Sequence, residues 1–137
     1  MRLVPYLNFD GNCAEAFKYY EQQLGGKITM IMPFSQMPGG NFGPEMADRT
    51  LHAHMEIAGT AIMASDTEPG KAQPVRSSYL ALSVDSTPDA ERIFKALTDG
   101  GEAIMPMQET FFAHRYGIAR DRFGILWMVL HDKEMQS

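Results

Sequence analysis

The residues with the clearest potential for chemistry lie in one short stretch, LHAHMEIAG, from Leu51 to Gly59. Apolar and polar residues alternate in it, which is typical of a β-strand with one buried face. Successive strand side chains point to opposite faces, so we expect His52, His54 and Glu56 on a single face. Two imidazoles and a carboxylate could bind a metal ion, or one imidazole could act as a general acid or base oriented by Glu56.

Three interpretations of this face are open. It could line a small-molecule pocket, or it could be an ordinary strand surface that is exposed or hydrogen-bonded. It could also hold a metal ion together with His114 or Glu109, since neighbouring residues on one strand face lie about 6.5 to 7 Å apart, a span that two ligands can bridge. A metal site would also need second partners that orient each imidazole, and these do not follow from residue spacing.

A second candidate site is the segment QETFFAHRYG, residues 108–117. Phe111, Phe112 and Tyr116 could stack on a planar or apolar ligand. Arg115 could pair with a carboxylate or phosphate in bidentate fashion. The alternative is core burial for the aromatic rings and a structural ion pair for the arginine. The residues expected to bind a ligand are Gln108, Phe111, Phe112, His114, Arg115 and Tyr116, together with Tyr79 from a different strand.

The composition is that of an ordinary globular protein. Of 137 residues, 45% are hydrophobic and 21% are charged, which is enough to bury a core without a metal or disulfide. The net charge of −5 argues against nucleic acid or an anionic membrane as a partner. The chain has no signal-peptide pattern, and no apolar run approaches the roughly twenty residues of a membrane span. We therefore expect a cytoplasmic protein with neither nucleic acid nor membrane as a partner.

Two units with the same order of elements are predicted along the chain. Each contains a strand, a helix that ends at Gly-Gly, and three more strands. The strands expected in the first unit are RLVPYLNF, KITMIMPF, TLHAHMEI and TAIMASD. Those expected in the second are SSYLALSVD, EAIMPMQETFF, RYGIARD and ILWMVLHD. An internal repeat of this kind indicates one structural unit used twice.

The starts of the two helices carry local capping signals. Asn12, followed three residues later by Glu15, has the pattern of a capping box. Thr87 is the expected cap of the second helix, with Pro88 at its first position. Cys13, the single cysteine, excludes an internal disulfide. A helix start could lower its thiol pKa, but a small buried apolar role is favoured.

Both units are expected within a single domain, residues 1–137. The first unit covers about residues 1–66, a linker covers 67–77, and the second unit covers about 78–132. One short helix cannot cover both faces of a four-stranded sheet, so each sheet has an open face. We therefore predict an α+β fold in which two βαβββ units form a curved mixed sheet around a cavity. The Gly/Pro-rich loop 35–49 is expected to be a lid over a ligand or an arm in a dimer.

Three stretches carry a resemblance to a known family: PYLNFDGNCAEAFKYYEQQLGG, HAHMEIAGTAIMASD and QETFFAHRYGIARDRFGILWMV. Over almost its whole length the chain resembles the PhnB-like family of the vicinal oxygen chelate superfamily, which includes glyoxalases, bleomycin-resistance proteins and dioxygenases. The resemblance implies paired βαβββ units, a small-molecule ligand and a homodimer. One departure from the family pattern is Phe112, where tryptophan is usual, followed by Ala113 and His114.

The resemblance also implies where a metal ion would be held. The metal enzymes of the superfamily use four strand positions, which match this chain near Pro5, Ile62 or Met63, Tyr79 and Met128. Proline offers no ligand, and a thioether is a poor partner for Zn²⁺, Ni²⁺ or Fe²⁺. We therefore expect no metal and no cofactor, with a divalent metal in a rearranged ligand set as the alternative.

Three functions are consistent with the sequence. The favoured one is a metal-independent small-molecule-binding protein, or an enzyme of unassigned reaction with His52 or His54 as general acid or base. The alternatives are a divalent-metal-dependent glyoxalase- or dioxygenase-type enzyme, and an antibiotic-sequestering protein of the resistance type. The family's inherited label as a ubiquinone-pathway methyltransferase has no support here, because no Gly-rich turn between a strand and a helix offers a nucleotide site.

Overall fold

The computed structural model describes residues 1–40 and 42–134. The chain forms two compact units, unit 1 with residues 1–73 and unit 2 from residue 74 onward, and the boundary lies within the expected linker 67–77. Each unit has the order strand, helix, strand, strand, strand, which confirms the predicted α+β fold with paired βαβββ units. In the described part of the chain, no helix is long and apolar enough to cross a membrane.

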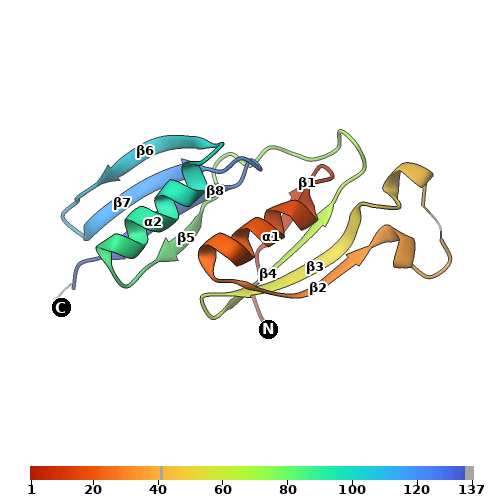
Figure 1. Cartoon of the computed structure of the whole chain (residues 1–137), viewed down its shortest axis with the longest axis horizontal. Helices are drawn as coiled ribbons and strands as arrows, with labels where there is room; N and C mark the ends of the chain where they lie inside the picture. Colours follow the sequence, from red (N-terminus) through yellow and green to blue (C-terminus); the bar gives the residue numbers. More distant parts are fainter. Residues whose placement is uncertain (41, 135–137) are drawn as a thin grey trace. The chain divides into compact units, whose positions relative to one another are not determined.

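The strands of each unit pair into one four-stranded mixed sheet (Figure 1). Unit 1 contains β1 (Tyr6–Phe9), α1 (Cys13–Leu24), β2 (Lys27–Pro33), β3 (Thr50–Ile57) and β4 (Thr60–Asp66). Unit 2 contains β5 (Leu80–Ser83), α2 (Thr87–Thr98), β6 (Glu102–Gln108), β7 (Ala113–Arg120) and β8 (Leu126–Asp132). Two short 3-10 turns, η1 (Phe34–Gln36) and η2 (Pro44–Met46), lie in the predicted loop 35–49, of which residue 41 lies outside the described residues.

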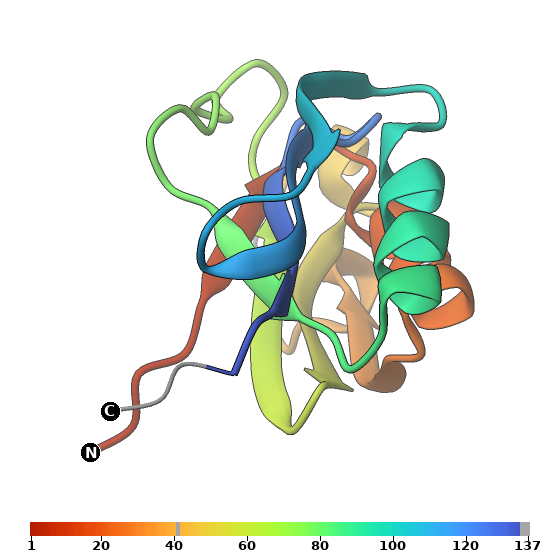
Figure 2. The ribbon, with the colours of Figure 1, turned by 90° about the vertical axis from the view of Figure 1, so that its left-hand side faces the viewer.

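The two sheets have the same topology. Their strand orders are β1-β4-β3-β2 and β5-β8-β7-β6. The first strand of each unit is parallel to the last, and the other neighbours are antiparallel. In each unit the helix contacts three strands of its own sheet, and Figure 2 shows α2 against one face of the unit 2 strands. Each sheet therefore has a helix face and an open face.

Alternation along the strands decides which side chains reach the core. In β3, Ala53, Met55 and Ile57 are buried, and they share the core of unit 1 with the α1 side chains Phe17 and Tyr20. Burial of these apolar side chains is the main stabilising contribution to the unit. The same alternation leaves the residues between them on the open face.

In unit 2, the helix approaches its sheet closely at Gly117. A Cβ atom at this position would lie 2.9 Å from Cε2 of Phe94 on α2 and 2.7 Å from Sδ of Met107. Gly117 pairs with Val129 in the register of β7 and β8, so Val129 and Trp127, two residues before it, share the helix face. Met128 between them lies on the open face.

The start of α1 differs from the prediction. The Asn12 side chain makes no capping hydrogen bond. Asp66, at the end of β4, instead accepts hydrogen bonds from the backbone N–H groups of Gly11 at 2.8 Å and Cys13 at 3.0 Å. The capping-box prediction was therefore wrong, because a carboxylate from a distant strand occupies the position that a local side chain was expected to fill.

The start of α2 was predicted one residue too late. Ser86, and not Thr87, is the N-cap, and its hydroxyl accepts a hydrogen bond from the N–H of Asp89 at 3.2 Å. Thr87 is the first helical residue, and its hydroxyl lies 3.1 Å from Nδ1 of His131 on β8. Both residues are good N-caps by type, so the choice between them depended on the backbone path after β5.

The first strand of each unit is shorter than predicted. β1 begins at Tyr6 because its pairing with β4 covers the four residues Tyr6–Phe9, with Met63–Asp66 as partners. The backbone carbonyl of Pro5 still accepts a hydrogen bond from Met63 N–H at 3.0 Å. In unit 2, β5 begins at Leu80, three residues after Ser77, where the predicted strand SSYLALSVD began. A strand ends where its pairing with the neighbouring strand ends. Alternation within one strand does not indicate where that is.

Cys13 is expected to resist alkylation by iodoacetamide at about pH 8 in the folded protein and to react once urea unfolds the chain. The side chain is fully buried. Burial, and then the charge of Asp66, raise the pKa of the thiol from 9.0 to about 12, whereas a hydrogen bond with Thr50 lowers it. Mass spectrometry of the adduct measures the reaction, and rapid labelling of folded protein would contradict the assignment.

The same thiol makes stability depend on pH. The folded state binds the thiol proton more tightly than the unfolded state, so this contribution is complete below pH 9.0. It is lost as the pH rises from there toward about 12. The favoured interpretation of Cys13 as a small buried residue agrees with this environment.

Candidate functional site

The candidate site is built on the open face of unit 1, the side of the sheet that does not contact α1. His52 and His54 lie on this face half-buried and Glu56 lies on it exposed, between the buried residues Ala53, Met55 and Ile57. The structure therefore brings together the three residues that the alternation in LHAHMEIAG placed on one face.

His52 is held by a tyrosine from the neighbouring part of the sheet. The Tyr6 hydroxyl lies 3.1 Å from Nδ1 of His52. The two rings are also stacked, with centroids 5.7 Å apart and planes inclined by 23°. Tyr6 comes from β1, whose register places it beside Met63 of β4. A hydrogen bond and a ring contact together fix the orientation of this imidazole.

His54 is held by a threonine on β2, the strand that pairs directly with β3 at this edge of the sheet. Oγ1 of Thr29 lies 2.6 Å from Nδ1 of His54, and the same hydroxyl donates to the backbone carbonyl of His54 at 3.1 Å. Thr29 reaches the histidine at an irregularity of the β2–β3 pairing between Ile28 and Met30. An irregularity of this kind redirects a side chain, which here places the hydroxyl against the ring.

The orienting partners of both histidines were missed by the sequence reasoning, which assigned that role to Glu56. Glu56 is exposed and pairs in register with Lys27 and Ala61. The Nδ1 atoms are instead in contact with Tyr6 and Thr29. The missing information was the register between strands, because Tyr6 and Thr29 lie 46 and 25 residues away from their histidines.

The second candidate segment forms an aromatic cluster in unit 2. The rings of Phe111 and Phe112 meet edge to face with centroids 5.2 Å apart, and Phe112 and Tyr116 do so at 5.4 Å. Phe111 is 84% exposed, an unusual environment for a large apolar ring. The edge-to-face contact of these rings is the favoured geometry of aromatic pairs. Gln108 is exposed and pairs in register with Tyr116.

Arg115 and His114, which belong to the same segment, contact residues outside the aromatic cluster. Arg115 binds Glu91 on α2, with Nη2 and Nε each 2.6 Å from Oε1, so the structural ion pair is the interpretation that the geometry favours. The His114 ring contacts the ring of His131, with centroids 4.8 Å apart. The aromatic rings therefore contact one another, whereas Arg115 is paired with Glu91.

Two further residues named from the sequence have environments of their own. Glu109, the alternative metal ligand, lies 2.8 Å from Nζ of Lys133, whose hydrogen bond and charge lower the pKa of that exposed carboxyl. Tyr79 is 43% exposed and comes immediately before β5.

A family model matches residues 2–129, and it describes the Glyoxalase/Bleomycin resistance protein/Dioxygenase superfamily. This chain belongs to that superfamily. Protein YjdN of Escherichia coli (strain K12) is 35% identical over 138 residues, with 94% of each chain covered. Protein PA1353 from Pseudomonas aeruginosa is 39% identical in its crystal structure, with a TM-score of 0.88 over 98% of this chain and 99% of that chain. The PhnB protein from Bacillus cereus shares the fold at 19% identity, with a TM-score of 0.80 over 96% of this chain and 99% of that chain.

The superfamily includes metal enzymes, so the four positions matched to their ligands are a direct test of this chain. Ile62 is buried on the helix face, which leaves Met63 as the residue on the open face of unit 1. In unit 2, Met128 holds the corresponding place and pairs with Ala81. The groups at these positions do not suit a divalent ion of this class, because two are thioethers and one is a tyrosine. The fourth is a proline, whose carbonyl already accepts a hydrogen bond from Met63. The residues present do not fit the metal of the superfamily.

The remaining ligand-type side chains give the same result within each unit. Among residues 1–40 and 42–134, neither unit contains a group of three His, Cys, Asp or Glu side chains that could hold a metal ion. Among the described residues of β3, His52 and His54 carry imidazoles on the open face, and their Nδ1 atoms are in contact with hydroxyl groups. The arrangement is suited to hydrogen bonding and proton transfer through Nε2.

Proposed function

We propose that this superfamily member binds a small organic molecule on the open face of unit 1 without a metal ion, through Nε2 of His52 and Nε2 of His54. The observation that supports this most directly is the pair of contacts at Nδ1, from Tyr6 at 3.1 Å and Thr29 at 2.6 Å. Each imidazole is held on one side, which leaves its second nitrogen for a ligand. Groups fixed before binding lose less entropy when the ligand arrives.

The two histidines present opposite hydrogen-bonding properties in this proposal. The single hydroxyl hydrogen of Thr29 goes to the His54 carbonyl, which can only accept, so Nδ1 of His54 must donate to Oγ1. Nε2 of neutral His54 is then an acceptor. At His52 we assign the Tyr6 phenol as the donor to Nδ1, an assignment that puts the ring hydrogen on Nε2. The face thus offers one donor and one acceptor.

A donor and an acceptor about 6.5 to 7 Å apart along the strand suit a ligand that carries a carbonyl beside a hydroxyl group. His52 would donate to the carbonyl oxygen and His54 would accept from the hydroxyl. Where a reaction follows, His54 is the general base and His52 the general acid, and histidine is well suited to both roles near neutral pH. A homodimer and a cytoplasmic location belong to the same proposal and rest on the resemblance to PhnB-like proteins.

The ligand is expected among small hydroxycarbonyl compounds, with hydroxyacetone and lactate as probes and acetone and propionate as their analogues without the hydroxyl. Titration followed by the imidazole NMR signals should show stronger binding for the hydroxylated probe of each pair. Tyr6→Phe removes one hydrogen bond and should weaken binding about fivefold, corresponding to about 1 kcal/mol. His52→Ala should weaken it by about tenfold or more.

His131→Ala is the matched control, because it removes an imidazole that faces the start of α2 in unit 2. It should leave the affinity unchanged in folded protein, as judged by circular dichroism. Equal binding by His52→Ala and the native chain would overturn the proposed site. A divalent metal at one equivalent per chain after dialysis without chelator would overturn its metal independence.

A second candidate is a sequestering protein of the resistance type, which the aromatic cluster of unit 2 favours. Phe111, with 84% of its surface exposed, adjoins Phe112 and Tyr116 and offers a stacking surface. Binding of this kind would be insensitive to the loss of His52 and sensitive to Phe111→Ala. The same two variants therefore separate the two candidates.

A further inference from the structure

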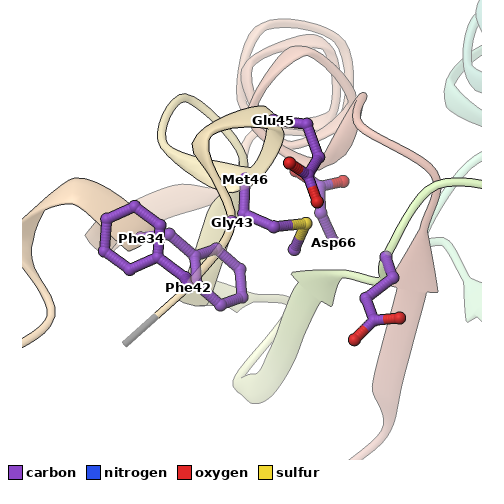
Figure 3. Close-up of a pocket in the computed structure, with 7 residues that line it drawn as sticks. Phe34, Phe42, Gly43, Glu45, Met46 and Asp66 are labelled. Carbon is purple, nitrogen blue, oxygen red and sulfur yellow. The ribbon is translucent and has the colours of Figure 1, made fainter. Parts of the chain in front are cut away.

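Unit 1 contains a pocket of about 230 Å³ away from the open face. It lies between the loop that carries η1 and η2 and the end of β4 (Figure 3). Its lining residues are Phe34, Phe42, Gly43, Glu45, Met46, Asp66 and Glu68. Asp66 lies on the helix face of β4, with the buried Ile62 and Ala64 at alternate positions before it. The pocket is therefore a different site from the one that contains His52 and His54.

The walls of the pocket combine aromatic rings with a thioether. Phe34 and Phe42 meet edge to face, with centroids 6.2 Å apart and planes inclined by 61°. Met46 is 5% exposed. In the view of Figure 3 the two rings lie together on one side, and the Glu45 and Asp66 carboxylates lie on the other. Ring faces beside carboxylates form an environment that attracts a cation with an apolar surface.

The charged groups that line the pocket are all acidic: Glu45, Asp66 and Glu68. Arg49, on the segment between η2 and β3, does not line the pocket. Its Nη1 donates to Asp10 at 2.8 Å and to the Thr67 carbonyl at 2.9 Å. The carboxylates of the pocket are therefore not neutralised by a lining cation.

Asp66 retains a hydrogen-bonding position for a ligand. Its carboxylate is 5% exposed and accepts three backbone N–H groups, from Gly11, Cys13 and Thr50. An ionised carboxylate has about four acceptor positions, so one is left after these three. A buried carboxylate with an acceptor position in a pocket wall points to a ligand that donates hydrogen bonds or carries positive charge.

We propose that this pocket binds a small organic cation, an ammonium group on a compact apolar body. Glu45, Asp66 and Glu68 supply the opposite charge, and Phe34, Phe42 and Met46 contact the apolar part. The volume, at about 30 Å³ per water-sized group, corresponds to roughly eight non-hydrogen atoms. A ligand of this size is smaller than the molecules that occupy pockets of roughly 300 Å³ or more.

The test compares choline with 3,3-dimethyl-1-butanol, which has the same shape and no charge. Both are titrated into the full-length protein, and the NMR signal of the Met46 methyl group reports occupancy. Choline should give saturable shifts and bind about tenfold more tightly than the neutral analogue. Its affinity should fall as salt is added, because salt screens the carboxylates.

Two variants give the comparison its control. Glu45→Gln removes one charge from the pocket and should weaken choline binding severalfold, whereas Glu102→Gln makes the same change on an exposed strand of unit 2 and should leave it unaltered. Phe42→Leu should weaken binding while preserving an apolar wall. Equal affinity for choline and its neutral analogue, an equal effect of the two glutamine substitutions, or no saturable shift of Met46 at millimolar choline would each overturn the proposal.

Discussion

Replacing Asp66 by alanine is expected to lower the free energy of unfolding by about 3 to 4 kcal/mol. Oδ1 of Asp66 accepts the N–H groups of Gly11 and Cys13, and Oδ2 accepts that of Thr50 at 2.8 Å. Alanine would leave these three donors without their acceptor in a region that is largely closed to water. It would also remove a negative charge from the positive end of the α1 dipole.

The matched control for this substitution is Asp132→Ala. Asp132 ends the last strand of unit 2 as Asp66 ends that of unit 1, but it is exposed and accepts one hydrogen bond, from Ser83 at 3.1 Å. Its loss should cost less than about 0.5 kcal/mol. Urea denaturation of the native protein and both variants measures the difference. Similar midpoints for the two variants would show that Asp66 does not hold the start of α1 and β3 together.

Asp121→Ala is expected to have the second large effect, about 3 kcal/mol of unfolding free energy. Asp121 is 3% exposed, and its Oδ1 accepts from the N–H groups of Phe123 and Ile125 in the turn between β7 and β8. Its Oδ2 accepts from Nε1 of Trp127 at 2.8 Å. Removing the carboxylate would take this acceptor away from the indole N–H of a side chain that is 1% exposed.

A double-mutant cycle isolates the part of this cost that belongs to Trp127. In a Trp127→Phe background the indole N–H is already absent, so Asp121→Ala should cost about 1 to 2 kcal/mol less than in the native chain. Asp85→Ala, at an exposed position before α2, controls for the loss of one negative charge. Circular dichroism during urea denaturation provides a readout that does not depend on tryptophan. Additive effects of the two substitutions would contradict the proposed coupling.

The order of elements and the sides of the sheets could be predicted because both follow from patterns within single segments. Alternation in LHAHMEIAG was sufficient to place Ala53 and Met55 toward the core and the histidines away from it. In α2 the apolar residues Ile93, Phe94 and Leu97 likewise recur at helical spacing, and all three are buried. These patterns arise because each strand or helix must bury one apolar face, so the spacing of apolar residues within the segment indicates that face.

The contacts that define the candidate sites could not be predicted in the same way. For Arg115 the sequence left a choice between a ligand anion and a structural ion pair, and only the position of α2 over β7 supplies Glu91 at 2.6 Å. The N-terminus of α1 could not be predicted either. Asn12 is a suitable capping residue by type, but the carboxylate of Asp66, 53 residues from Cys13, accepts the hydrogen bond. Several local side chains can satisfy a polar group equally well, so the choice among them depends on which distant strand lies nearby.

The sequence by itself determined the repeated strand–helix–strand order and the face that carries His52 and His54. Only the tertiary structure decided that Tyr6 and Thr29 orient these imidazoles and that the loop around Phe42 forms a pocket with Asp66. The physical reason is range. Periodicity reflects the burial of one face, and residues close together in the sequence are enough to produce it. A hydrogen bond at about 3 Å depends instead on the register between strands that are tens of residues apart in the chain.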